Sequence, residues 1–287
     1  MNERLHIVLS SDDAYAKYLS ITIASILRHG EEESWFFHIL DGGIAAGDKQ
    51  KIADMVERRQ GCLEFLPVHA GMLSDMALNI HASSHVSPAT YYRLLIPSLL
   101  SVERCVYLDC DTLCRASLLP LWQTDLQGCL AAAVKDIDED THAVRLGLQR
   151  YFNAGMLLMD LSSMRRLNIQ KSFFDFLQTH HDRIVLHDQD VINAVLDGKI
   201  KEVDMRWNVQ VAFTRQCRNT GFFARGKNAH IIHYIGHRKP WTYEKKVPYQ
   251  GEYIPYMLDS VFDELRETVP FSWKVKCTLN NMVGHSS

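Results

Sequence analysis

The stretch Val106-Tyr107-Leu108-Asp109-Cys110-Asp111 joins an apolar run to two carboxylates that are separated by one residue. Its first three residues are typical of a buried β-strand. Because side chains alternate across a strand, we expect Asp109 and Asp111 on one side and Cys110 on the other. Two carboxylates at a strand end offer hard oxygen ligands to a divalent cation that can also hold a diphosphate. The alternative is a solvated turn, because aspartate is a common turn residue.

Strand-like and helix-like segments alternate on both sides of this stretch. In the first half, strands are expected at 5–10, 35–40, 63–68, 105–108 and 130–134, and helices at 14–29, at 49–59 and from Pro88 onward. In the second half, the pattern predicts strands at 155–161 and 230–234 and helices near 163–168, 172–180, 188–196 and 252–268. This alternation favours an α/β sheet with helices on both faces, in which ligands bind at the carboxyl ends of the strands. We expect a catalytic domain at 1–250 and a small helical extension at 251–287.

Composition excludes several classes of protein. The chain has 287 residues and is 47% hydrophobic, which is ordinary for a globular protein. Its net charge is −3, so it lacks the excess of basic residues that is typical of nucleic-acid-binding domains. We see no secretory signal, and the apolar runs are shorter than the roughly 20 residues that span a bilayer. The seven cysteines are scattered without a CxxC pair, which favours reduced thiols in a cytosolic protein. Cys105, Cys110 and Cys114 fit no zinc spacing, and a structural role is favoured for them.

Other polar groups fall where these segments begin or end. Asp12 and Asp13 follow the first strand, either as ligands at the same sheet edge or as helix N-caps. Asn153-Ala154-Gly155 precedes a strand, and Asp188-Gln189-Asp190 opens a helix. The segment 233–241 closes the late strand with histidine, glycine, lysine, proline and tryptophan. Glycine lets the backbone approach a ligand, and lysine supplies a phosphate contact.

With these motifs in view, the sequence resembles glycosyltransferase family 8, the retaining nucleotide-sugar transferases. It looks closest to the bacterial branch of lipooligosaccharide galactosyltransferases and glucosyltransferases. The resemblance runs from Ile7 to about Trp241, and its six motifs stand in the family's order. They are Ile7-Val8-Leu9-Ser10-Ser11-Asp12-Asp13, Thr90-Tyr91-Tyr92-Arg93-Leu94, Tyr107-Leu108-Asp109-Cys110-Asp111, Phe152-Asn153-Ala154-Gly155, Asp188-Gln189-Asp190, and His233-Tyr234 with Gly236 and Lys239-Pro240-Trp241.

The resemblance implies a GT-A fold, with a mixed and mostly parallel central sheet, a UDP-sugar donor and Mn²⁺, for which Mg²⁺ is a possible substitute. It implies that Asp109, Asp111 and His233 hold the metal, and an imidazole ligand suits a transition metal better than Mg²⁺. The implied donor contacts are Ser10, Ser11, Asp12 and Tyr15 for uracil and ribose, Arg93, Gly236 and Lys239 for the diphosphate or sugar, and Asp109, Cys110 and Asn153. The implied catalytic residues, near the anomeric carbon, are Gln189, Asp188 and Asp136.

Retention of configuration leaves two mechanisms open. An enzyme nucleophile gives a double displacement, whereas attack on the face of the leaving group needs none. Gln189 is an amide and a poor nucleophile, which favours same-face attack. Asp188 and Asp190 flank it, so double displacement stays open.

The sequence also departs from the family pattern. Ala14 stands where relatives often have asparagine, the segment 79–87 on the acceptor side is longer, and His237-Arg238 adds charge beside the diphosphate. Only the segment 273–276 hints at the basic, aromatic tail through which relatives dock to membranes. The resemblance therefore implies a cytoplasmic protein with at most a weak peripheral contact to the inner face of the cytoplasmic membrane. Its implied acceptor is a glycan or glycolipid such as a growing lipopolysaccharide.

Two other functions compete with this interpretation. One is a metal-dependent nucleotidyltransferase of similar fold, which would be expected to carry a glycine-rich phosphate loop where Ser10-Ser11-Asp12-Asp13 stands. The other is a non-catalytic relative that binds sugar nucleotides, against which the intact Asp109, Asp111 and His233 argue. The sequence leaves the donor sugar, the linkage and the oligomeric state open.

Overall fold

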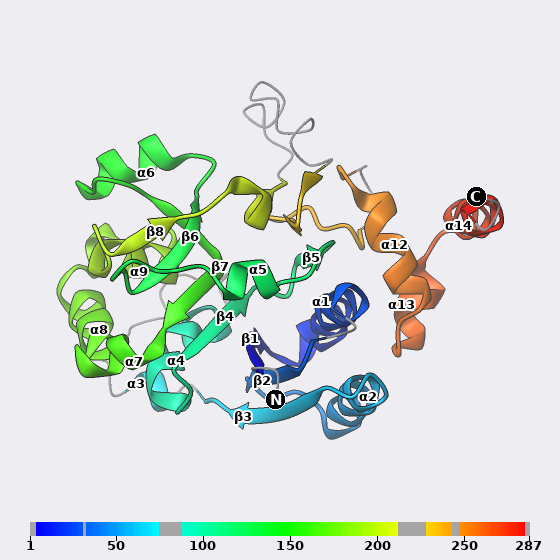
Figure 1. The fold of residues 1–287 in the computed structure, drawn as a ribbon, viewed down its shortest axis with the longest axis horizontal. Helices are drawn as coiled ribbons and strands as arrows, with labels where there is room; N and C mark the ends of the chain where they lie inside the picture. Colours follow the sequence, from blue (N-terminus) through cyan, green and yellow to red (C-terminus); the bar gives the residue numbers. More distant parts are fainter. Residues whose placement is uncertain are drawn as a thin grey trace.

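The computed structural model describes residues 4–30, 33–69, 71–74, 88–211, 228–242 and 247–284. A central sheet has the strand order β3-β2-β1-β4-β7-β6-β8 (Figure 1). These strands are β1 (Leu5–Ser11), β2 (Trp35–Asp41), β3 (Cys62–Pro67), β4 (Arg104–Leu108), β6 (Ala131–Lys135), β7 (Phe152–Asp160) and β8 (Ile200–Glu202). β7 runs antiparallel to both neighbours, and the other pairings in this sheet are parallel. The expected mixed, mostly parallel α/β sheet is confirmed.

A second, small sheet joins three segments that lie far apart in the sequence. It has the order β5-β10-β9, with β5 (Thr112–Cys114), β9 (Val209–Gln210) and β10 (Ile231–His233). β10 pairs antiparallel with β5, and His233 lies opposite Thr112. Since Thr112 directly follows Asp111, this pairing carries the late histidine to the two early aspartates.

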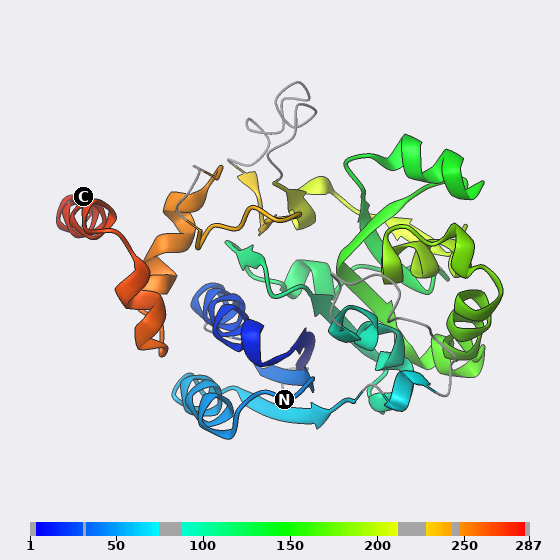
Figure 2. The same cartoon turned by 180° about the vertical axis from the view of Figure 1, so that it is seen from behind.

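Helices cover both faces of the central sheet (Figures 1 and 2). They are η1 (Asp13–Tyr15), α1 (Ala16–His29), α2 (Ala46–Glu57), α3 (Gly71–Ser74), η3 (Pro88–Leu95), α4 (Ile96–Leu99), α5 (Leu119–Trp122), α6 (Glu139–Leu146), α7 (Leu161–Arg166), α8 (Ile169–Thr179), η4 (His181–Arg183), α9 (His187–Val195), η5 (Met205–Asn208), α12 (Gln250–Leu258), α13 (Asp263–Thr268) and α14 (Phe271–Gly284), where η denotes a 3₁₀ helix. Alternate strand residues enter different cores, as strand geometry requires. Ile7 and Leu9 pack in the core that includes α1 and α12, whereas Val8 packs in the core that includes η3, α7, α8 and α9.

Two expected helices differ in detail from the structure. The segment that begins at Pro88 is a 3₁₀ helix that passes into the short α4. The single helix expected over 252–268 is wrong, because the chain breaks after Leu258 and resumes as α13. At the break, the buried Ser260 hydroxyl accepts a hydrogen bond from the Phe262 N–H at 3.1 Å. Such a local bond offers the backbone an alternative to the helical one.

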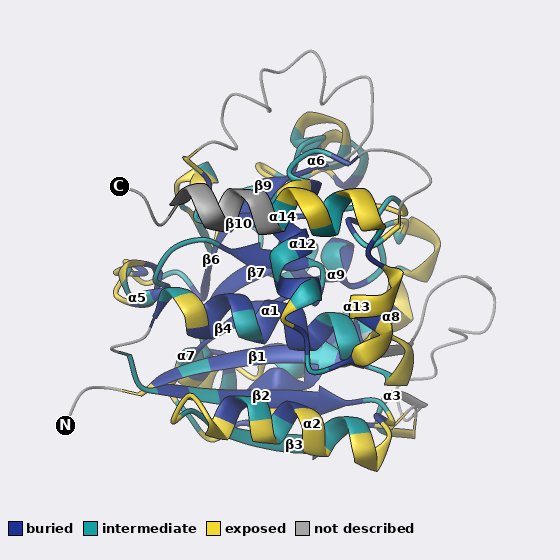
Figure 3. Ribbon diagram, turned by 90° about the vertical axis from the view of Figure 1, so that its right-hand side faces the viewer, coloured by how far each residue is buried: buried dark blue, intermediate teal, exposed yellow. Residues whose placement is uncertain are grey.

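The C-terminal helices share the core of the first half of the chain. Tyr253, Ile254 and Met257 of α12 are fully buried in the core that also holds Ile7 and Leu9. Figure 3 shows the buried side of α12 facing the strands, while α14 presents exposed residues outward. Within the described ranges, every helix is too short or too polar to span a bilayer.

We expect Ile254→Ala to lower the free energy of unfolding by about 2–5 kcal/mol, the cost of a cavity in a core that includes β1. Ile254 is 0% exposed. The matched control is Phe271→Ala, because Phe271 is 80% exposed and its removal should change the stability by less than about 0.5 kcal/mol. Urea unfolding measures both variants. Equal stability of the two would contradict the shared core.

Candidate functional site

Asp109 and Asp111 lie in the turn that joins β4 to β5. The turn is closed by the Thr112 N–H, which donates to Asp109 O at 3.2 Å. It is also anchored to the neighbouring elements, because Asp109 N–H donates to Gly155 O at 2.9 Å and Thr22 of α1 donates to Cys110 O at 3.0 Å. The two carboxylates share one site as expected, but a turn brings them together and not the alternation of a strand.

Cys110 points away from this site. Its thiol donates to Ser10 O at 3.0 Å, and the side chain is buried in the core that includes α1. Burial raises the pKa of this thiol well above its ordinary value. The described geometry therefore gives Cys110 a packing role beneath the turn, and its expected donor contact stays a prediction.

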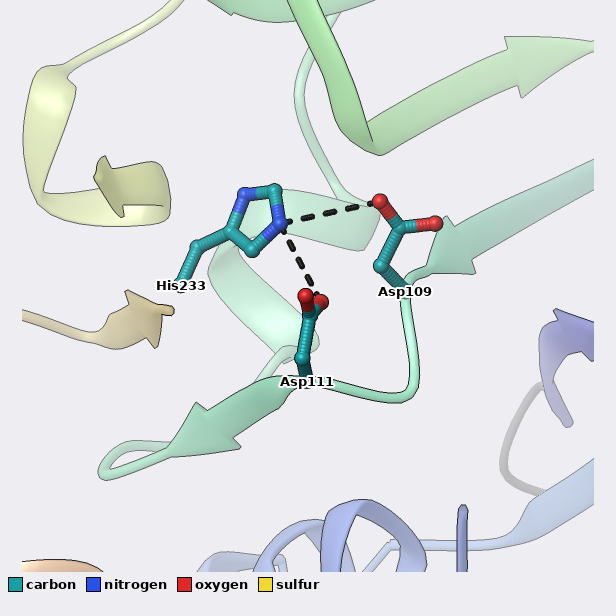
Figure 4. Close-up of side chains that lie close together, drawn as sticks. All are labelled: Asp109, Asp111 and His233. Carbon is teal, nitrogen blue, oxygen red and sulfur yellow. Dashed lines mark ion pairs between the residues drawn. The ribbon is translucent and has the colours of Figure 1, made fainter. Parts of the chain in front are cut away.

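Asp109, Asp111 and His233 form a cluster whose ligand atoms all lie within 4.8 Å of one another (Figure 4). His233 Nε2 lies 3.2 Å from Asp111 Oδ1 and 3.6 Å from Asp109 Oδ2. Asp111 Oδ1 is buried and receives no hydrogen bond in the described structure. Because a buried oxygen without a partner is costly, and two carboxylates with one imidazole are common metal ligands, the cluster fits a divalent cation.

Lys239 stands on the other side of Asp111. Its ammonium contacts Asp111 Oδ2 and donates to Tyr234 O at 2.7 Å. Burial alone would raise the pKa of Asp111, but Lys239 and His233 hold it well below its usual range. Asp111 is therefore ionised and able to bind a cation at neutral pH.

Arg93 is the counter-ion of the inner carboxylates. Its Nη2 donates to Asp109 Oδ1 at 2.8 Å, and its Nε lies 2.8 Å from Asp188 Oδ2. The remaining nitrogen donates to Ala154 O at 2.7 Å, and the guanidinium lies 4.5 Å from the ring centre of Tyr107. Burial raises the pKa of Asp188 to about 7 in spite of this neighbour. These contacts engage the whole guanidinium, so the expected contact of Arg93 with the donor stays a prediction.

A second hydrogen-bonded group lies beside the cluster, where β6 ends and β7 and α9 begin. Asn153 Nδ2 donates to Asp136 Oδ2 and to Gln189 Oε1, each at 3.2 Å. Gln189 Nε2 donates to Asp136 Oδ2 at 3.1 Å, and its Oε1 accepts from Ala154 N–H at 3.0 Å. The structure thus brings Gln189 and Asp136, two of the residues expected near the anomeric carbon, together with Asn153, an expected donor contact.

The two aspartates that flank Gln189 are buried, whereas Gln189 itself is half-buried. Asp190 accepts from Arg145 at 2.6 Å, from the Tyr151 hydroxyl at 2.5 Å and from the N–H groups of Val185 and Leu186. Asp188 faces Arg93. Of the three adjacent side chains, the amide is the accessible one.

The residues expected to hold the nucleotide lie at the end of β1 and directly after it. Asp12 caps η1, where its Oδ1 accepts from Tyr15 N–H at 3.2 Å, so the cap interpretation is correct for this residue. Ser11 is buried and donates to Asp12 O at 2.8 Å, and Ser10 accepts from Cys110. Tyr15 is 40% exposed.

The last motif makes aromatic contacts with η1 and α1, which follow the first motif. Trp241 stacks on Tyr18 with ring centres 3.8 Å apart and meets Tyr15 edge-on at 6.1 Å. Gly236 has a φ of 74°, a left-handed conformation that favours glycine. The segment 79–87, expected on the acceptor side, lies outside the described residues.

Two residues of this site were not assigned a role from the sequence. Gly155 was quoted only as part of a motif, yet a Cβ there would lie 2.1 Å from His233 Cε1 and 2.8 Å from Asp109 Oδ2. Asn208 is buried with its Oδ1 3.0 Å from His233 Nδ1. The signal for Asn208 was weak: a polar residue between Trp207 and Val209 in an apolar stretch.

The family of the chain follows from comparison with known proteins. The family described as Glycosyl transferase family 8 matches residues 6–245. The chain belongs to this family. It is therefore a glycosyltransferase, as expected, and the catalytic fold is of the GT-A type.

Individual relatives agree with this assignment. General stress protein A of Bacillus subtilis is 32% identical over 272 residues, which cover 89% of this chain and 94% of that protein. Lipopolysaccharide 1,2-glucosyltransferase of Escherichia coli is 25% identical, with 84% of this chain and 73% of that protein covered. The crystal structure of the galactosyltransferase LgtC, solved with donor and acceptor sugar analogs, is 27% identical with a TM-score of 0.77, and the match covers 95% of this chain and 100% of that one.

We expect Gly155→Ala to weaken Mn²⁺ binding at least tenfold, because the added methyl group displaces His233 and Asp109. Isothermal titration calorimetry of the purified protein measures the dissociation constant. The control is Gly47→Ala on α2, where a Cβ would meet nothing within 4 Å. Equal Mn²⁺ affinity of Gly155→Ala and the wild type would contradict the close approach of β7 to the cluster.

Proposed function

We propose that this family 8 enzyme is a retaining hexosyltransferase that moves galactose or glucose from a UDP-sugar to a hydroxyl of a growing surface glycan such as lipopolysaccharide. The observation that carries the proposal is the cluster of Asp109, Asp111 and His233 beside the polar group of Asn153, Gln189 and Asp136. One side suits a cation with a diphosphate, and the other suits sugar hydroxyls. The names of relatives support the choice of reaction, among them the lipopolysaccharide 1,3-galactosyltransferase of Salmonella typhimurium.

The metal ligands and Lys239 would stabilise the leaving group. A divalent cation held by Asp109, Asp111 and His233, for which we propose Mn²⁺, supplies Lewis-acid stabilisation of the departing UDP when bound. Lys239, which contacts Asp111, lies where its ammonium can add a second positive charge beside the same oxygens. Arg93 donates to Asp109 and orients its carboxylate.

The burial of Asp188 and Asp190 supports same-face attack. A carboxylate nucleophile needs an oxygen that reaches the anomeric carbon. Asp190 accepts four hydrogen bonds, and Asp188 is paired with Arg93. Gln189 is half-buried and the most accessible of the three, and its amide can hold the sugar through hydrogen bonds without forming a bond to carbon.

The surroundings of the enzyme follow from the same proposal. We place it in the cytoplasm, with a glycan or glycolipid acceptor and no nucleic-acid partner. A weak peripheral membrane contact would use α14, where Phe271 and Val275 are exposed beside Lys274 and Lys276. Exposed apolar groups with neighbouring lysines are typical of interfacial helices.

We expect Asp109→Asn to abolish Mn²⁺-dependent release of UDP from UDP-galactose or UDP-glucose, because one ligand charge is lost and Arg93 loses one of its two carboxylate partners. The assay measures UDP with and without Mn²⁺ and tests both donors. Asp175→Asn on α8 is the matched control, since Asp175 is exposed and pairs with Lys171. Near-normal turnover by Asp109→Asn would contradict the metal assignment, and release of UDP from neither donor by the wild type would contradict the hexosyltransferase.

We expect no covalent glycosyl intermediate. Asp188→Ala and Asp190→Ala are each incubated with the donor and azide, and the products are separated by mass spectrometry and NMR. If a carboxylate were the nucleophile, its removal would let azide attack and give a glycosyl azide of inverted configuration. Such a product from either variant would establish double displacement and exclude same-face attack, and Gln189→Ala with azide is the control.

A further inference from the structure

A chain of side-chain amides connects the imidazole of His233 to the polar group of Asn153, Gln189 and Asp136. Asn208 Oδ1 lies 3.0 Å from His233 Nδ1, and Asn208 Nδ2 donates to Asn153 Oδ1 at 2.9 Å. Asn208 is 1% exposed, so water does not replace these partners. Each end of one buried amide therefore contacts a different part of the site.

The direction of this chain is fixed by the backbone. Gly155 N–H donates to Asn153 Oδ1 at 3.0 Å, and a backbone N–H can only donate. Asn153 Oδ1 is therefore an acceptor, and Asn208 must turn its NH₂ group toward it. The contact of Asn153 Nδ2 with the Asp136 carboxylate agrees with this orientation. The Oδ1 and Nδ2 atoms of both side-chain amides are thus assigned from their hydrogen-bond partners.

The same direction determines which nitrogen of His233 faces the amide. Asn208 presents a carbonyl oxygen to Nδ1, and a carbonyl only accepts, so Nδ1 carries a proton. Nε2 faces Asp109 and Asp111 and is therefore the nitrogen that would bind a cation. A hydrogen bond from the distal nitrogen is the usual way in which proteins orient a histidine that binds a metal.

We propose that Asn208 is a positioning residue that keeps a proton on Nδ1 of His233, so that Nε2 faces the metal site, and that it couples the metal cluster, through Asn153, to the polar group of Asn153, Gln189 and Asp136. The proposal rests on the proposed function for the identity of the cation and the donor. The proton on Nδ1 follows only from the hydrogen bonds within this chain.

Two substitutions of Asn208 separate its two contacts. Asn208→Leu removes both, so we expect the proton on Nδ1 of His233 to be lost and Mn²⁺ to bind 10–100-fold more weakly, the usual cost of losing a partner of a metal ligand. Asn208→Asp keeps an acceptor for His233 but loses the donor to Asn153. We expect it to retain the Nδ1 proton and Mn²⁺ affinity within about threefold, while the KM for the UDP-sugar rises at least tenfold.

The measurements are chosen so that a merely structural role would not reproduce them. Long-range ¹H–¹⁵N NMR of the metal-free protein identifies the protonated nitrogen of His233, whose signals are assigned with His233→Gln. Calorimetry gives the Mn²⁺ affinity. Asn193→Leu is the matched control, because Asn193 is also buried and bonds both backbone groups of Phe152 but bonds no atom of His233 in the described structure. It should lower the melting temperature and leave the Nδ1 proton of His233 and the Mn²⁺ affinity unchanged.

The outcomes distinguish this inference from the proposed function. A wild-type His233 without a proton on Nδ1 overturns the inference, even if Asn208→Leu fails to fold. A folded Asn208→Leu with the wild-type Nδ1 proton and Mn²⁺ affinity also overturns it. Failure of the wild type to bind Mn²⁺, with the Nδ1 proton present and lost in Asn208→Leu, supports the positioning role and contradicts the proposed metal.

Discussion

The reversed direction of β7 is the constraint on which the site depends. β7 lies between β4 and β6 and runs against both, with Met156 beside Leu108 and Phe152 beside Lys135. The first residues of β7 therefore lie at the edge where β4 and β6 end. A parallel β7 would place its last residue there and Asn153 at the opposite edge. The reversal is what sets Asn153 between Asp136 and the metal cluster.

The position of the small second sheet also depends on β7. β10 brings His233 beside Thr112, and the imidazole then lies over Gly155 with no space for a methyl group. Gly155 also accepts from Asp109 N–H, so one residue sets the position of two of the three metal ligands. Its lack of a side chain is a requirement of packing and not of backbone conformation. A residue in the middle of a strand motif thus matters as much to the cluster as the ligands do.

The sequence predicts the elements of this fold better than their pairing. Apolar runs such as 5–10 and 35–40 are long enough to predict β1 and β2 within a residue. The run that forms β7 is buried on both faces, and such a run has the same pattern in either direction, so the antiparallel pairing was not predictable. The three residues of β5 and the two of β9 are too few to show a period, and their pairing with β10 depends on the tertiary structure.

The site was likewise predictable where the signal is local and not where it depends on distant segments. Motifs located the carboxylates, because aspartate after an apolar strand is a local signal. The partners of Arg93, at Asp109 and Asp188, come from different elements and could not be predicted from spacing. Asn208 was missed for the same reason, since its role exists only once three distant segments meet.

The charges of the connected network give an independent reason for a divalent cation. Its five carboxylates face three arginine and lysine side chains. The carboxylates are Asp109, Asp111, Asp136, Asp188 and Asp190, and the arginines and lysine are Arg93, Arg145 and Lys239. The carboxylates outnumber these cations even when Asp188, whose pKa is raised to about 7, is counted as neutral. Since buried charges without counter-ions are costly, and the one buried carboxylate oxygen without a hydrogen bond in the cluster faces His233 Nε2, the excess is located where one M²⁺ ion would neutralise it. The net charge of the chain is only −3, but several of its carboxylates gather at this edge of the sheet.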